Sequence, residues 1–225
     1  MTLRLRTFLV VLLASVALPV SAQGWYVGAS VGRAKAADAG SNVSSGVNEA
    51  CAVAITAGAT GCAAFVNYDE NRTGASFFAG QKYGRYVGAE VGYVDLGTYD
   101  LSGSFLVSGS GGTATLLGSE EDKASATYID AVLTYPVTPV VSVFGKVGIA
   151  YMHNEESCSL SGAVCGSHTD NSWEPDFSIG VGTEITPTVG LRLAYSQFNS
   201  VGDSNYEYTA GNFRYLELAG IVHFR

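Results

Sequence analysis

The sequence predicts an all-β fold, an eight-stranded antiparallel up-and-down transmembrane β-barrel with short periplasmic turns and long extracellular loops. Three observations predict it: a composition that favours strands, eight segments of alternating polarity, and connections that alternate between short and long. Hydrophobic residues make up 47% of the chain and charged residues only 14%, beside 28 glycines and 13 tyrosines. Because glycine favours turns and tyrosine favours pleated surfaces, this composition indicates strands and turns rather than helices.

The first 22 residues have the features of a secretory signal. Arg4 and Arg6 precede an apolar segment at residues 8–20, and Val20-Ser21-Ala22 resembles a signal-peptidase cleavage site. The apolar segment is shorter than the roughly 20 residues that a membrane-spanning helix needs. We therefore expect a signal peptide at residues 1–22 and a single β-barrel domain at residues 23–225.

Alternation of apolar with small or polar residues defines the eight predicted strands. In the first segment, Trp25, Val27, Ala29 and Val31 fall on one face, and glycine, serine and tyrosine on the other. The remaining segments are residues 73–83, 87–93, 127–135, 141–151, 177–185, 189–196 and 216–224. Such segments approach the roughly 9–11 residues that a tilted strand needs to cross a bilayer. The apolar face is expected to contact lipid, and the other face the barrel interior.

The connections between these segments alternate in length. The short ones are residues 82–86, 135–139 and 185–188, and the long ones are residues 34–72, 96–124, 153–173 and 199–212. Short periplasmic turns and long outer loops are typical of outer-membrane barrels. A soluble β-sandwich predicts no such difference between its two ends.

Charge is concentrated in the long connections. Without Arg4 and Arg6 the chain keeps ten basic residues against 20 acidic ones, which argues against nucleic acid as a partner. The acidic run Glu120-Glu121-Asp122 has two interpretations, a divalent-ion site or a solvated surface, and we expect the second because exposed carboxylates are usually solvated. Four basic residues are expected at the outer strand ends, where they either meet lipopolysaccharide phosphates or aid solubility as loop charges: Arg33, Arg72, Lys123 and Arg214.

Four cysteines lie in two of the long connections. Cys51 and Cys62 are in the first, and Cys158 and Cys165 are in the third. An even number of cysteines in an oxidising compartment predicts two disulfides. Four cysteines allow three connectivities, and closeness in sequence favours one local disulfide in each connection. The spacings do not resemble a zinc site, and we expect neither a metal nor a cofactor.

Three short stretches resemble the OmpA-like and OmpX-like small eight-stranded outer-membrane barrels. They are Val87-Gly-Ala-Glu-Val-Gly-Tyr93, Tyr135-Pro-Val-Thr138 leading through Phe144-Gly-Lys-Val-Gly148, and Ile185-Thr-Pro187 followed by Leu191-Arg-Leu193. Phe224 is similar to the aromatic residue that closes the last strand in that family. The resemblance covers residues 24–225 and implies a monomer in the outer membrane of a Gram-negative bacterium.

Five charged residues fall on the interior faces of the predicted strands. They are Glu90, Asp130, Lys146, Arg192 and Glu217. An eight-stranded barrel is just wide enough for side chains to fill it, so buried charges there must pair. The family resemblance implies an ion pair between Glu90 and Arg192. Val132 stands where the family has an inward lysine.

We expect a non-enzymatic structural and surface protein that contributes to membrane integrity and to extracellular interaction or adhesion through its acidic loops. The expected partners are outer-membrane lipid, lipopolysaccharide, and a host or phage surface ligand. One alternative is a narrow, low-conductance pore gated by the interior ion pairs. A second is a lipid-A-modifying enzyme, which needs His153 or His168 beside a nucleophile, but the His-x-Ser spacing of deacylase barrels is absent.

Overall fold

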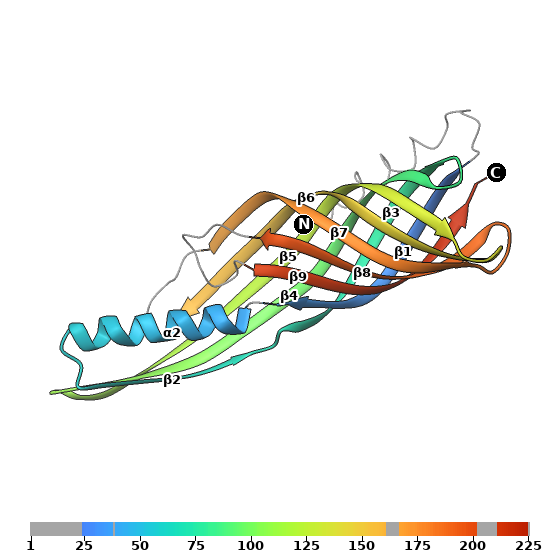
Figure 1. The fold of residues 1–225 in the computed structure, drawn as a ribbon. Helices are drawn as coiled ribbons and strands as arrows, with labels where there is room; N and C mark the ends of the chain where they lie inside the picture. The colour runs from blue at the N-terminus through green and yellow to red at the C-terminus, as the bar shows by residue number, and fades with distance from the viewer. Residues whose placement is uncertain (1–23, 38, 161–166, 202–210, 225) are drawn as a thin grey trace, which may run out of the picture.

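The computed structural model describes residues 24–37, 39–160, 167–201 and 211–224, so the predicted signal peptide and Cys165 lie outside the described residues. Eight strands close into an antiparallel ring, in which each strand pairs with its neighbour in sequence and the last pairs with the first (Figure 1). They are β1 (Trp25–Ala36), β3 (Asn71–Tyr83), β4 (Val87–Gly109), β5 (Gly112–Pro136), β6 (Val141–Leu160), β7 (Ser167–Glu184), β8 (Val189–Val201) and β9 (Gly211–His223). The predicted eight-stranded barrel is confirmed.

The two faces of each strand have opposite environments. Ile129 on β5 faces outward and is exposed, whereas its neighbour Asp130 faces inward and is buried. The interior is filled largely by aromatic rings that lie against inward glycines. A Cβ atom on Gly80 would lie 2.2 Å from Cζ of Tyr26, and one on Gly28 would lie 2.2 Å from Cζ of Phe78. Glycine on the inner face therefore makes room for rings from neighbouring strands.

Exposed aromatic side chains mark the two membrane boundaries, where amphipathic rings are favoured. Tyr93, Tyr151 and Trp173 lie at the outer boundary, and the rings of Tyr151 and Trp173 are 5.0 Å apart. Tyr83 and Tyr135 lie at the periplasmic boundary. The predicted short turns are confirmed at this end, after β3, β5 and β7.

Where the structure describes them, the long connections contain strands and a helix in place of irregular loops. Residues 96–124 are strand: β4 and β5 stay paired to Gly109 and Gly112, and only Ser110 and Gly111 form the turn. A ninth strand, β2 (Gly61–Tyr68), pairs with the outer half of β4. The physical reason is that strand pairing satisfies the backbone groups of this segment, and its Thr, Tyr, Val and Phe residues favour strands.

A helix, α2 (Ala39–Thr56), occupies the first long connection, where the all-β prediction placed none. Gly58 follows its C-terminal end with a φ of 101°, the left-handed conformation that glycine adopts readily. A disulfide between Cys51 and Cys62 joins α2 to β2. Among the described residues, no helix is long and apolar enough to cross a bilayer. We call residues 39–68, 97–124 and 153–160 the outer extension.

Candidate functional site

Glu90 on β4 is the centre of the barrel interior. Its side chain is buried, with 1% of the residue exposed. Lys146 on β6 donates a hydrogen bond to Oε1 at 2.6 Å, and Arg192 on β8 donates one to Oε2 at 2.7 Å. The hydroxyl of Tyr26 on β1 donates to the same Oε2 at 2.9 Å. Three strands thus supply donors to one carboxylate, and these donors compensate its buried charge.

Aromatic rings surround the two cations. The guanidinium carbon of Arg192 lies 4.7 Å from the ring centroid of Tyr26 and 5.0 Å from that of Phe144. Nζ of Lys146 lies 5.5 Å from the ring centroid of Tyr128 and 5.6 Å from that of Phe78. These distances are within the range of cation–π attraction, so the rings stabilise the charges as well as fill space.

A second polar layer lies nearer the outer end of the barrel. Glu217 on β9 accepts hydrogen bonds from Ser30 and, at 3.2 Å, from Ser76. Asp130 on β5 and Asp176 on β7 are both buried, and the Oδ1 atom of each has no hydrogen-bond partner among the described residues. The cavity beside them measures about 10 Å³, which is room for about one water molecule.

The structure brings together three of the five predicted interior residues, Glu90, Lys146 and Arg192. The lysine comes from β6, not from the position of Val132 on β5 where the family resemblance expects one. Asp130 and Glu217 are interior but form no ion pair among the described residues. Sequence reasoning missed Asp176, although its place directly before the outward-facing Phe177 assigns it to the inner face.

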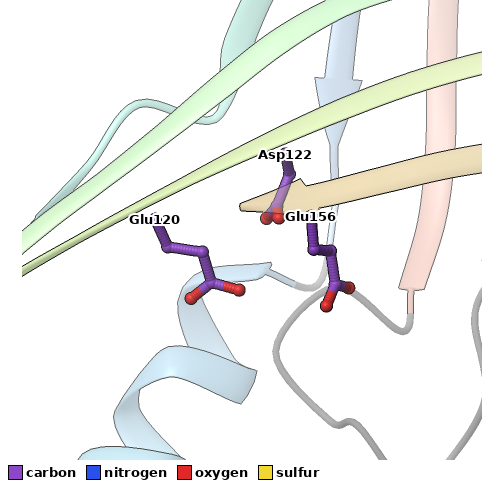
Figure 2. A group of neighbouring side chains, drawn as sticks. All are labelled: Glu120, Asp122 and Glu156. Carbon is purple, nitrogen blue, oxygen red and sulfur yellow. The ribbon is translucent and has the colours of Figure 1, made fainter. Parts of the chain in front are cut away.

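Three carboxylates meet in the outer extension. Glu120 and Asp122 on β5 and Glu156 on β6 offer oxygen atoms that all lie within 4.8 Å of one another, and Figure 2 shows the three side chains turned toward a common space. Burial, and then the charges of Glu120 and Glu156, raise the pKa of Asp122 to about 8. The expectation of a solvated acidic run was wrong for Asp122, which is buried because alternate residues of β5 face inward. Glu121, which lies between Glu120 and Asp122 in the sequence, faces outward and is exposed.

The basic residues predicted at the outer strand ends differ in their contacts. Arg72 forms ion pairs with Asp69 and, at 2.7 Å, with Asp100. A hydrogen bond from the backbone N–H of Asn71, and then the charge of Arg72, hold the pKa of Asp69 below its ordinary value. The remaining three residues are exposed on the outward face: Arg33, Lys123 and Arg214.

The closed ring, the two aromatic boundaries and the short turns at one end define a small outer-membrane β-barrel. The sequence profile of the OmpA-like transmembrane domain family matches residues 20–224, and the chain belongs to this family of the Gram-negative outer membrane.

Outer membrane protein A of Shigella flexneri is 29% identical over 136 residues, a match that covers 60% of this chain and 36% of that protein. Outer membrane protein A of Escherichia fergusonii is 30% identical over 138 residues, with the same coverage. The chain thus matches only about a third of the length of these relatives. The crystal structure of Neisserial surface protein A shares the fold, with a TM-score of 0.53, 14% identity, and coverage of 90% of this chain and 98% of that one.

Proposed function

We propose that this protein is a closed, non-catalytic barrel that contributes to outer-membrane integrity and presents the outer extension for extracellular interaction or adhesion. The observation that supports closure is Glu90, which holds cations from β6 and β8 across the middle of the barrel. Opening a water path would separate a buried carboxylate from two buried cations. Breaking a buried pair by removing a partner costs several kcal/mol, so the filled interior favours a plug over a pore.

The outer extension supports the surface role. Phe65 on β2 and Leu117 on β5 both pair with Ser104 on β4, one from each side, and are therefore neighbours on one face of the sheet. Phe65 is 67% exposed, beyond the outer aromatic boundary and away from the bilayer. Large exposed apolar side chains outside the membrane are typical of a surface that contacts another molecule. The acidic residues elsewhere in the outer extension, such as Asp100 and Glu121, favour a partner that carries basic groups.

Contact with lipopolysaccharide is the second proposed interaction. Arg33, Lys123 and Arg214 face outward near the outer boundary. Arginine and lysine bind phosphate through charge-assisted hydrogen bonds. A ring of such residues would anchor the barrel to the phosphates of the outer leaflet.

Closure is tested by electrophoretic mobility with and without heating, followed by conductance of the same folded protein in planar bilayers. We expect mobility that changes on heating, which reports a folded barrel, and no conductance steps. Stable open steps would support the gated pore instead. Recovery of the protein in soluble form without a heat-dependent shift would contradict the membrane barrel.

The surface role is tested with the Phe65→Ser/Leu117→Ser variant on cells that display equal amounts of folded barrel. Adherence to host cells is expected to fall, and to stay unchanged in the Phe77→Ser control, which alters an exposed ring within the lipid-facing zone. Equal adherence of all three proteins would argue against this surface.

The enzyme alternative has weaker support. Nδ1 of His153 lies 2.6 Å from Oδ1 of Asn171, and Nε2 lies 3.3 Å from Oε1 of Glu155, so its ring nitrogens face hydrogen-bonding groups rather than a nucleophile. We expect the lipid A mass spectrum of cells to be the same with and without the protein. A change in acyl-chain number that depends on His153 would support the enzyme.

A further inference from the structure

Two adjacent strands place three carboxylates on one inner face of the outer extension. Asp122 and Glu156 are direct partners in the β5–β6 register, and Glu120 lies on the same face two residues before Asp122. Oxygen ligands of calcium lie about 2.3–2.6 Å from the ion, so ligands on opposite sides are about 5 Å apart. One carboxylate oxygen from each residue lies within 4.8 Å of the other two, which is compatible with one ion bound by all three residues.

Buried oxygen atoms without partners lie on the inner faces of the same two strands. Asp122 is 8% exposed, and its Oδ1 atom has no hydrogen-bond partner among the described residues. Asn154 is 5% exposed, lies on the inner face of β6 two residues before Glu156, and has an Oδ1 atom that is also unpartnered in the described structure. Leaving a buried acceptor unsatisfied costs roughly 1–3 kcal/mol. The amide oxygen of Asn154 is a neutral calcium ligand, which a purely repulsive acidic cluster would not supply.

Two of the three carboxylates, those of Glu120 and Asp122, also lack the counter-charges that the barrel interior has. Within the described residues, neither Glu120 nor Asp122 forms an ion pair, whereas Glu90 in the same chain has two. Lys123 follows Asp122 directly and so faces the opposite side of β5. Arg72 is engaged by Asp69 and Asp100. A bound cation would supply positive charge beside Glu120 and Asp122.

We propose that Glu120, Asp122 and Glu156, with the amide oxygen of Asn154, bind one calcium ion that joins β5 to β6 in the outer extension. All four ligands are hard oxygen donors, and water can complete the six to eight ligands that calcium accepts. Magnesium is disfavoured because it requires near-ideal octahedral geometry and loses water reluctantly. The ion would stiffen the base of the proposed interaction surface.

The test uses the full chain, refolded in neutral detergent without lipopolysaccharide, and calcium chloride titrated in a calorimeter. We expect one ion per chain, with a dissociation constant of roughly 10⁻⁴–10⁻³ M, as in extracellular calcium modules. Asp122→Asn should weaken binding at least about tenfold, since it removes a charged ligand. Glu121→Gln is the matched control on the opposite face of the same strand, and its affinity should match that of the wild type.

Absence of saturable binding to the wild-type chain would overturn the proposal, as would equal loss of affinity in the two variants. Terbium luminescence gives an independent measurement, because Tyr99 pairs directly with Asp122 across β4 and β5 and can sensitise a bound ion. Calcium should displace terbium, and magnesium should not at the same concentration. Equal displacement by magnesium would overturn the assignment to calcium.

Discussion

The carboxylate of Glu90 illustrates how one buried residue can determine the state of a whole interior. Lys146 and Arg192 reach it from two strands, and Tyr26 donates from a third. The two cations lie in a low-dielectric space, and the desolvation cost is offset by this carboxylate together with the surrounding aromatic rings. The stability of the barrel should therefore depend on Glu90 more than on a carboxylate at the rim.

Glu90→Ala should reduce the free energy of unfolding by about 3–5 kcal/mol, because it leaves two buried cations without their partner. Urea unfolding in lipid vesicles, followed by tryptophan fluorescence, measures this change. Glu184→Ala is the control: Glu184 lies at the periplasmic rim, 3.9 Å from Nζ of Lys82, and its removal should cost less than about 1 kcal/mol. Equal losses in the two variants would contradict the central role of Glu90.

Asp69 provides a pH-dependent contact in the turn between β2 and β3. Its pKa is lowered by the backbone N–H of Asn71, at 3.1 Å from Oδ1, and then by Arg72. A lowered folded-state pKa means that the contribution of this carboxylate to the turn is present above pH 3.8 and is lost as the pH falls through the lowered pKa. Carboxyl carbon NMR should show a titration midpoint below 3.8, which moves up in Arg72→Gln. A midpoint at or above 3.8 in the wild type would show that the contact does not form.

Sequence parity assigns single residues to a face but not to a partner. It placed Glu90, Lys146 and Arg192 inside the barrel, and the family resemblance implied one of the two ion pairs. The contact with Lys146 depends on the depth at which each tilted strand places its residue, and the pattern of alternation carries no information about depth. The burial of Asp122 was not predicted either, because a residue beyond the membrane was assumed to be solvated.

At the scale of the element, inward glycines determine how rings pack between strands. Gly80→Ala should destabilise the barrel by about 1–3 kcal/mol, because the added methyl group would overlap the ring of Tyr26 and disturb its hydrogen bond to Glu90. Gly220→Ala is the matched control, since a Cβ there meets no atom within 4 Å. Chemical unfolding in vesicles measures both. A Gly80→Ala barrel as stable as the control would mean that the interior adjusts freely.

The cost of placing a charge on the lipid-facing side of β6 should depend on the depth of that position in the membrane. Val147→Arg, near the midplane, should cost about 2–4 kcal/mol, and Val143→Arg should cost less, because arginine near the interface reaches water. Val143 pairs with Tyr135 at the periplasmic boundary, which places it nearer that interface. Unfolding free energies of the two variants provide the measurement. The reverse order would show that the membrane is centred elsewhere on the barrel.

The membrane-spanning strands could be predicted because lipid imposes a strict rule on every second residue. Beyond Tyr93 and Trp173 water surrounds the chain, the rule no longer applies, and the outer parts of β4 and β5 were taken for loops. Helix α2 was missed because its glycine, serine, asparagine and valine residues give only a weak helix preference, and its position depends on β2 and on the disulfide.

At the scale of the whole molecule, the barrel and the outer extension are held together by different interactions. The barrel is closed by strand pairing and stabilised by lipid outside and paired charges inside. In the outer extension, α2 contacts the sheet at β2, and the Cys51–Cys62 disulfide links the two (Figure 1). The local span of that disulfide, 11 residues, restricts only this part of the chain. The two parts should therefore lose structure independently.

Cys51→Ser/Cys62→Ser should leave the unfolding of the barrel unchanged while loosening the outer extension. A disulfide that closes a short loop contributes up to roughly 3 kcal/mol, and here the contribution acts on α2 and β2 alone. A glutamate-specific protease should then cut faster after Glu49, an exposed residue within α2. Cys158→Ser/Cys165→Ser is the matched control, which should leave cleavage after Glu49 at the wild-type rate. If the free energy of unfolding of the barrel fell together with the rise in the cleavage rate, the outer extension and the barrel would instead fold as one cooperative unit.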